Sequence, residues 1–252
     1  MEHFISVEGV SLKFRLYHDK GATLRQSFAS LLRRSGEAGY TDFWALRDLN
    51  LRIADGDRVG IVGPNGAGKS SLLKTMCRIY TPASGSIRMR GTVAPLLEVG
   101  AGFHPQLTGR ENILLNGIIL GQTPERMREL EAEIIEFSGL EEFIDTPVKY
   151  YSTGMYLKLA FTVATAIRAD ILILDETFAG GDAAFVERAM ERLRRLVSDA
   201  RIMVCVSHQL QFLESICNRA VLMERGGIVA EGSPAEIVAL YTKRSGAAAA
   251  PR

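Results

Sequence analysis

The sequence GPNGAGKSS, residues 63–71, fits the pattern G-x-x-x-x-G-K-[ST] and directly follows the apolar stretch Val59–Val62, which has the composition of a buried strand. Its glycines let the backbone turn with N–H groups pointing inward, and a helix is expected to begin near Lys69. An ordinary strand-to-helix turn would need neither the lysine nor the hydroxyl, so we predict that Lys69 reaches the β- and γ-phosphates of a nucleotide and that Ser70 ligates Mg²⁺. The predicted nucleotide-binding residues are Gly63, Pro64, Asn65, Gly66, Ala67, Gly68, Lys69, Ser70 and Ser71.

Composition limits the remaining possibilities. The 252 residues are 47% apolar, enough for one large domain or two small ones, and a net charge of +1 gives no argument for nucleic acid as a partner. Three cysteines without metal-ligand spacing indicate reduced thiols. No apolar run reaches the length of about 18 to 20 residues that crosses a bilayer, and no signal peptide is evident. A role at a membrane would therefore require a partner or a surface helix.

Strand-like and helix-like segments alternate along most of the chain, which predicts an α/β fold with a mostly parallel sheet covered on both faces. An antiparallel β edge layer is expected from the alternating residues at the N-terminus, and a helical subdomain at about 105–165. Helices are expected from Lys69 to about Tyr80, from 160 to 167 and from 185 to 197. Buried strands are expected at 171–174 and 202–206, and a hairpin at 221–230, followed by a helix that ends near Thr242. The domain is predicted to span 1–244, with a flexible tail at 245–252.

One inserted segment, at about 22–34, resembles a short basic amphipathic helix. Two interpretations remain open: the helix packs on its own domain, or it contacts a membrane surface or a partner. The apolar positions are Leu24, Phe28, Leu31 and Leu32, and the basic ones are Arg25, Arg33 and Arg34.

Two acidic residues, Asp175 and Glu176, end the buried strand at 171–174, at the sheet edge where parallel-sheet proteins bind ligands. Asp175 is a candidate Mg²⁺ ligand, and Glu176 is a candidate base that deprotonates the attacking water in phosphoanhydride hydrolysis. His208 follows the next buried strand and is a candidate for contacting the γ-phosphate or positioning that water.

A second anion-binding turn is predicted at Tyr151–Met155, just before a helix. Its residues Ser152, Thr153 and Gly154 combine small hydroxyls with backbone N–H groups. Because one ATP has a single γ-phosphate, two such turns in one chain suggest that each nucleotide is shared between two copies of the protein.

These motifs together resemble those of ATP-binding cassette (ABC) ATPases of transporters. The phosphate loop (residues 63–71) is similar to the Walker A motif, residues 172–176 to Walker B, residues 180–182 to the D-loop and Ser207-His208 to the switch histidine. Residues 151–155, hereafter the signature turn, resemble the family's signature motif. The resemblance implies a homodimer in which Ser152 and Gly154 of one copy contact the ATP held by Lys69 of the other. It also implies two copies of a separate transmembrane permease.

Some positions differ from the common family pattern. The signature turn reads YSTGM rather than LSGGQ, and Glu98 stands nearest the place of a glutamine that contacts Mg²⁺ and water. The aromatic residue that stacks on adenine is not decided by the sequence, where Tyr40 competes with Phe43, Trp44 and Tyr17.

The same departures resemble one subfamily, the ATPases that export lipid-linked polysaccharides such as O-antigen or capsule. That resemblance implies peripheral attachment at the cytoplasmic face of the inner membrane and contact with a lipid-linked glycan through the 22–34 segment. Some relatives carry a C-terminal carbohydrate-binding domain, and because this sequence stops near residue 252 we expect none here. The alternatives are another kind of ABC importer or exporter, or a soluble ABC ATPase that acts outside transport.

Overall fold

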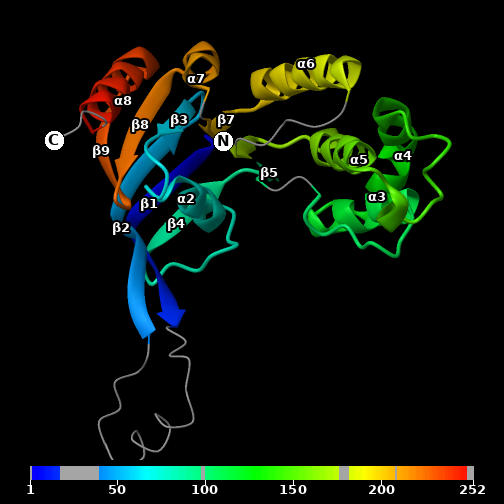
Figure 1. Cartoon of the computed structure of the whole chain (residues 1–252), viewed down its shortest axis with the longest axis horizontal. Coiled ribbons are helices and arrows are strands. Elements are labelled where there is room, and N and C mark those ends of the chain that lie inside the picture. The colour runs from blue at the N-terminus through cyan, green and yellow to red at the C-terminus, as the bar shows by residue number, and fades with distance from the viewer. Residues whose placement is uncertain (1, 18–39, 98–99, 176–181, 208, 249–252) are drawn as a thin grey trace, which may run out of the picture.

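Two sheets and a separate group of helices make up the protein (Figure 1). The computed structural model describes residues 2–17, 40–97, 100–175, 182–207 and 209–248. The smaller sheet is antiparallel, in the order β2-β1-β4, and consists of β1 (Phe4–Tyr17), β2 (Tyr40–Ala54) and β4 (Ser84–Arg90). The larger sheet has the order β5-β6-β7-β3-β8-β9 and consists of β3 (Arg58–Val62), β5 (Val93–Leu96), β6 (Ile171–Asp175), β7 (Ile202–Val206), β8 (Arg219–Glu224) and β9 (Gly227–Gly232).

The larger sheet is parallel from β5 to β8, and only the hairpin partner β9 runs antiparallel to its neighbour. Continuous apolar runs form its central strands, as expected where both faces are covered. In β6, Ile171 and Ile173 face one core and Leu172 and Leu174 face the other. The structure thus confirms the predicted α/β class, the mostly parallel sheet and the antiparallel layer.

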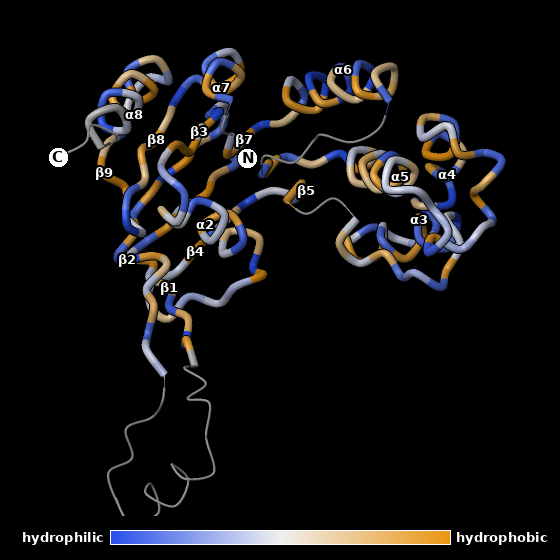
Figure 2. Tube along the Cα trace, viewed as in Figure 1, coloured by the Kyte–Doolittle hydropathy of each residue, from blue (hydrophilic) through white to orange (hydrophobic). Residues whose placement is uncertain are grey.

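Helices cover the two faces of this sheet unequally. The short helix α2 (Lys69–Met76) packs between the two sheets, while α6 (Ala183–Asp199), α7 (Leu210–Ile216) and α8 (Pro234–Ala248) cover the opposite face (Figure 1). Along α6 the hydrophobic and hydrophilic residues alternate with each turn (Figure 2). Its buried residues recur every four positions, which gives the helix one apolar face, and they are Phe185, Ala189, Leu193 and Val197.

The remaining helices form a lobe beside the sheet: α3 (Gly109–Ile119), α4 (Pro124–Ser138) and α5 (Thr153–Ala166) (Figure 1). A short 3-10 turn, Val148–Tyr150, precedes α5. Thr123 caps α4, as expected from the sequence, and its side chain accepts a hydrogen bond from the Arg126 N–H. The three helices share an apolar core of their own that includes Ile113, Met127 and Leu159. This lobe lies within the region where the sequence predicted helices.

Several elements differ from the sequence-based expectations, and α5, for example, begins at Thr153 rather than near residue 160. Helix α2 ends at Met76 rather than near Tyr80, because Arg78 adopts a left-handed conformation at φ 59° and the turn closes on the Lys74 and Thr75 carbonyls. Helix α8 continues to Ala248, past the predicted end near Thr242 and into the expected tail, where alanine-rich sequence favours helix. Strand β5 was not predicted, because Pro95 within its four residues argues against a strand; it forms one edge of the sheet, where proline is tolerated.

Candidate functional site

The carboxyl ends of three neighbouring strands form the floor of the site. Strand β7 lies between β6 and β3, and Val206 pairs with Asp175 on one side and with Ile61 on the other. Adjacent strands lie about 4.8 Å apart, so the backbones of Asp175 and Ile61 are separated by about 10 Å across the sheet. The phosphate loop starts two residues after Ile61. Asp175 therefore ends its strand at the same sheet edge as the loop, as the sequence predicted.

The phosphate loop depends on glycine at specific points. Gly63, Gly66 and Gly68 all have positive φ angles, of 155°, 77° and 101°. A Cβ on Gly63 would lie 2.2 Å from the Met223 carbonyl oxygen, and one on Gly68 would lie 2.5 Å from the Ala45 carbonyl oxygen. Strand β8 and the antiparallel sheet therefore approach the loop so closely that a side chain at either position would clash with backbone.

Lys69 starts helix α2 and is folded back across the loop. Its ammonium group donates hydrogen bonds to the carbonyl oxygens of Gly63, at 2.7 Å, and Pro64, at 3.0 Å. The side chain is buried, with 8% exposed, whereas the neighbouring Ser70 is exposed. The first N–H groups of a helix lack intrahelical acceptors and carry its positive dipole end, so a charged amine and a helix N-terminus converge on this loop. Such an arrangement binds phosphate.

The signature turn forms the N-terminus of α5 in the helical lobe. Ser152 is the N-cap residue, and its Oγ accepts a hydrogen bond from the Met155 N–H at 3.2 Å. Both Ser152 and Thr153 are exposed. A Cβ on Gly154 would meet nothing closer than Ser152 Oγ at 3.9 Å, so no described neighbour requires a glycine there. The structure confirms the expected helix start at this turn, and the binding of a phosphate there stays a prediction.

Helix α5 is also joined to the start of α6. Lys158 donates a hydrogen bond to a carboxylate oxygen of Asp182, whose other oxygen accepts the Phe185 N–H at 2.9 Å and caps α6. The pKa of Asp182 is lowered, first by the bond from Lys158 and then by the backbone N–H. Lys158 was not singled out from the sequence. From the sequence, Lys158 could have been noticed as a basic residue about one and a half turns into the helix that follows the signature turn.

Comparison with known proteins identifies the family. Residues 46–179, more than half of the chain, match the family model described as ABC transporter. The chain belongs to the ABC transporter family. The match includes the phosphate loop, Asp175 and the signature turn, and it confirms the resemblance inferred from these motifs. This protein is accordingly an ABC-type ATPase that binds nucleotide.

Several relatives of this ABC cassette are named as ATP-binding proteins of O-antigen or teichoic acid export. The chain is 48% identical over 197 residues to the O-antigen export system ATP-binding protein RfbB of Myxococcus xanthus, covering 78% of this chain and 45% of that protein. It thus spans less than half the length of this relative. It is 37% identical to RfbB of Klebsiella pneumoniae, covering 96% of this chain and 98% of that protein. A teichoic acids export ATP-binding protein, TagH of Lactococcus lactis, is 34% identical.

Solved structures confirm the fold of the cassette. A dimeric ATP-binding cassette in a post-hydrolysis state bound to ADP and Pi superposes with a TM-score of 0.66 at 21% identity, covering 91% of this chain and 98% of that one. An ATP-binding subunit of an ABC transporter gives a TM-score of 0.67 at 20% identity. At these identities the likeness establishes the fold alone.

Several predicted site features of the cassette lie outside the described residues: Glu98, Glu176, the first two residues of the D-loop (180 and 181), His208 and the 22–34 segment. Their roles stay predictions. Ser207, which precedes His208, is described, and its Oγ accepts a hydrogen bond from the Gln209 N–H at 3.0 Å.

The candidates for adenine stacking are separated along β2. Tyr40 is its first residue, and the Arg15 guanidinium lies over the Tyr40 ring at 4.9 Å. At about 3.4 Å per strand residue, Tyr40 is some 17 Å from Ala45, whose carbonyl approaches the phosphate loop. Trp44 is adjacent to Ala45 and 38% exposed, and Phe43 is 48% exposed. Strand spacing therefore favours Trp44 or Phe43 over Tyr40 as the residue nearer the loop.

Proposed function

We propose that this chain is the ATP-hydrolysing subunit of an exporter of lipid-linked polysaccharide, acting at the cytoplasmic face of the inner membrane through a separate permease. The observation that carries the proposal is the similarity to RfbB of Klebsiella pneumoniae, which extends over 96% of this chain and 98% of that protein and whose name states O-antigen export. Among the described residues, no helix is long and apolar enough to span a membrane.

Within one chain, the phosphate loop binds the nucleotide and the sheet edge carries the groups for hydrolysis. Lys69 is positioned to exchange its loop carbonyl partners for phosphate oxygens. Ser70 and Asp175 are oxygen donors that suit Mg²⁺, which when bound neutralises charge on the phosphates, and Glu98 is a further candidate ligand. Glu176 is the proposed base: it takes the proton of the water whose oxygen attacks the γ-phosphorus while ADP departs.

His208 is the proposed contact to the γ-phosphate. It directly follows Ser207, which comes after β7, the strand between β6 and β3. Because this strand leads to the sheet edge between the phosphate loop and Asp175, a side chain in the loop after it is suited to sense the terminal phosphate.

A homodimer completes the proposed site. The signature turn belongs to the helical lobe, whereas the phosphate loop belongs to the sheet, and α2 and α5 lie well apart in Figure 1. Ser152 and Thr153 are exposed, and Gly154 is not required by any described neighbour. These features support contact of the signature turn with the nucleotide on a second copy, whose γ-phosphate would then link two chains.

The helical lobe of this chain carries an exposed apolar surface that suits a protein partner such as the proposed permease. Ile118 and Ile119 end α3 and are 44% and 57% exposed, and Ile119 lies against Gly102 in the loop that leads from the sheet. Exposed adjacent isoleucines favour a protein partner. We propose that two copies of a permease dock here and that the 22–34 segment contacts the lipid-linked glycan.

Genetic complementation tests the export function. In cells that lack this gene, the wild-type chain should restore the polysaccharide on the cell surface, and Lys69→Ala should not, because it removes the phosphate-binding amine. Lys74→Ala, on the same helix but in its last turn, is the matched control and should restore export. Normal surface polysaccharide in cells without the gene would contradict the export function.

Copurification provides a second test. The chain extracted from membranes should carry a multi-span membrane protein, and Ile119→Asp should release it while ATP hydrolysis by the isolated chain is retained. Recovery of rRNA or DNA in place of a membrane protein would contradict a role in transport.

A further inference from the structure

Two of the three cysteines meet in the apolar core that α6, α7 and α8 cover. Cys205 belongs to β7 and is 1% exposed, and Cys217 is the C-cap residue of α7 and is partly exposed. Their Sγ atoms lie 3.5 Å apart, although the residues are 12 positions apart in the chain. A disulfide has an S–S distance of about 2.05 Å, so the two sulfurs would have to approach by about 1.5 Å to form one.

Hydrogen bonds of the sheet hold both cysteines at this place. The strand of Cys205 is paired on both sides, with β3 and with β6, so it cannot shift without disturbing two pairings. Next to Cys217, the Asn218 N–H donates to the Arg58 carbonyl at 3.0 Å, and the Arg58 N–H donates to Asn218 Oδ1 at 2.8 Å. The two sulfurs are therefore kept close together by the backbone on both sides.

Helix α7 lies closely on β3 beside the cysteines. A Cβ on Gly60 would lie 2.5 Å from Leu213 Cδ2, so Leu213 fills the space that the glycine leaves. Leu213 is fully buried, and its carbonyl accepts a hydrogen bond from the Cys217 N–H at 3.0 Å. The last turn of α7 thus joins Cys217 to the packing against β3, and a movement of Cys217 is passed to the helix.

The turn before α7 connects this helix to the edge of the sheet that carries the phosphate loop. Residues 207–209 join β7 to α7, and Ser207 Oγ accepts a hydrogen bond from the Gln209 N–H at 3.0 Å. The strand end before the turn pairs with Asp175 on one side and with the strand of the phosphate loop on the other. A shift of α7 therefore displaces a turn that lies between these two parts of the site.

The two thiols differ in their access to solvent. The pKa of Cys205 is raised, first by its hydrogen bond with Cys217 and then by burial, which keeps Cys205 in the thiol form. Cys217 is partly exposed, so a reagent in solution reaches its sulfur first. The pair thus combines an accessible sulfur with a second sulfur in contact with it, the arrangement that thiol–disulfide exchange requires.

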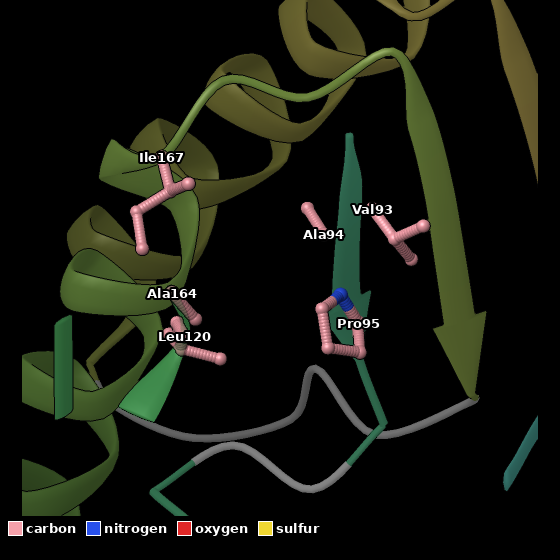
Figure 3. A pocket seen from close by; sticks show the side chains of 6 residues that line it. All are labelled: Val93, Ala94, Pro95, Leu120, Ala164 and Ile167. Carbon is pink, nitrogen blue, oxygen red and sulfur yellow. The ribbon is translucent and has the colours of Figure 1, made fainter. Parts of the chain in front are cut away.

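The far end of the same core offers no such chemistry. Ala94 and Ala164 belong to this core and line, with Val93, Pro95, Leu120 and Ile167, a cavity of about 10 Å³ (Figure 3). All of these side chains are apolar, so they give a water molecule or a small ligand no polar partner. The thiol pair is where a reagent can modify this core.

We propose that Cys205 and Cys217 are a site of reversible disulfide formation, at which a small organic disulfide joins α7 to β7 and slows ATP hydrolysis. The Cys217 thiolate attacks one sulfur of the oxidant, whose S–S bond breaks to release one thiolate. Cys205 then loses its proton to solvent, attacks Cys217 Sγ and releases the second thiolate. The two cysteines lose two electrons, and the oxidant gains them and takes up two protons as two thiols.

A count of free thiols tests formation of the bond. The chain is incubated with hydroxyethyl disulfide, and its thiols are then titrated with Ellman's reagent in urea. The three free thiols should fall to one, with the Cys205 and Cys217 peptides linked in mass spectrometry, and dithiothreitol should restore all three. Cys217→Ser should keep both of its thiols. Three thiols left in the oxidised wild-type chain, or reagent bound to Cys217 without the link to Cys205, would overturn the proposal.

Steady-state ATP hydrolysis tests the consequence of the bond. A misplacement of about 1 Å near reacting groups can cost up to about 100-fold in rate, so the oxidised chain should hydrolyse ATP about tenfold more slowly and recover with dithiothreitol. Cys217→Ser and Cys205→Ala should keep their rates in the oxidant. Cys77→Ala is the matched control and should respond like wild type, because Cys77 packs against the other core.

Thermal unfolding shows whether the bond acts on an intact fold. Closing the short segment 205–217 should raise the melting temperature by about 5 °C, since the bond restricts the unfolded chain. A lower melting temperature of the oxidised chain would mean that the bond damages the fold, and it would overturn regulation by this pair.

The slowing of hydrolysis rests on the proposed role of the loop after β7, where His208 stands in the sequence. If His208→Ala hydrolyses ATP at the wild-type rate, that proposed role fails whether or not the bond forms. If His208→Ala is slow, and the chain that carries the bond is as fast as the reduced chain, regulation by the cysteine pair is refuted.

Discussion

A substitution at Gly154 should separate the folding of one chain from its action on the ATP of a second chain in the proposed homodimer. In the structure Gly154 is the second residue of α5, and an added methyl group would meet only Ser152 Oγ at 3.9 Å. Gly68 provides the contrast, because its φ is 101° and an added Cβ would lie 2.5 Å from the Ala45 carbonyl oxygen. We expect Gly154→Ala to fold normally and to fail in function, whereas Gly68→Ala should fold poorly.

The local backbone conformation sets the expected size of each change in melting temperature. Alanine is favoured over glycine within a helix by up to about 1 kcal/mol, so Gly154→Ala should raise the melting temperature by about 1 to 3 °C in a chain of this size. Forcing a Cβ into a left-handed conformation costs about 1–3 kcal/mol before the backbone clash is counted, so Gly68→Ala should lower it by about 5 °C or more. The two changes should therefore shift stability in opposite directions.

The rate of ATP hydrolysis should not change in parallel with thermal stability. In the proposed homodimer, a methyl group at Gly154 would stand between the helix N–H groups and the γ-phosphate of the partner's ATP, where the backbone must approach closely. Steady-state ATP hydrolysis by Gly154→Ala should fall more than tenfold, with monomer affinity for ATP unchanged. Calorimetry, a phosphate-release assay and a nucleotide-binding titration check these values. A Gly154→Ala chain that hydrolyses ATP at the wild-type rate, or that is destabilised like Gly68→Ala, would refute the reasoning.

Three further outcomes are expected from the geometry. Burial raises the pKa of the Cys77 thiol to about 12, so at pH 8 Ellman's reagent should modify it at least 100-fold more slowly after folding than in urea. The pKa of Asp170 is lowered, first by the Thr92 backbone N–H and then by its hydroxyl. This interaction stabilises the fold above the unfolded pKa near 4 and is lost as pH falls through the lower folded value. Unfolding titrations should therefore show Asp170→Asn destabilised at pH 7 and equal to wild type near pH 2. Trp44→Ala should weaken ATP binding about fivefold and Tyr40→Ala less than twofold, as measured with a fluorescent nucleotide; the reverse order would assign adenine stacking to Tyr40.

The parts of the fold that could be predicted are those in which a local cause is sufficient. The phosphate loop needs glycines, a lysine and a hydroxyl at fixed spacing, and all are adjacent in the sequence. The buried strands β6 and β7 are runs of five residues that are apolar except for the terminal Asp175, and their short length and content of Ile and Val favour strand over helix. The cap at Thr123, followed by Pro124, specifies a helix start within two residues. Each of these features is decided by neighbours along the chain.

The features that sequence reasoning missed depend on distant contacts or on unusual backbone angles. Arg78 ends α2 in a left-handed conformation without the glycine that normally signals it. Strand β5 forms because it pairs with β6 at the edge of the sheet, although Pro95 weakens the sequence pattern of a strand. Nothing in the sequence around Tyr156 distinguishes it from an ordinary aromatic residue of a helix. Its hydrogen bond to the Gly100 carbonyl, 56 residues earlier in the chain, could not be predicted from the sequence.

The register of the central strands explains why motifs so far apart in sequence act at one place. Strand β7 comes more than 100 residues after β3 in the chain, yet it lies between β6 and β3 in the sheet, and Val206 pairs with both Asp175 and Ile61. Because side chains alternate along a strand, a slip of one residue in either pairing would turn the end of β6 to the other face of the sheet. The apolar alternation of Leu172 and Ile173 between two different cores opposes that slip. The packing of the core therefore fixes where the carboxylate stands relative to the phosphate loop, and core substitutions that change this alternation should impair hydrolysis before they unfold the protein.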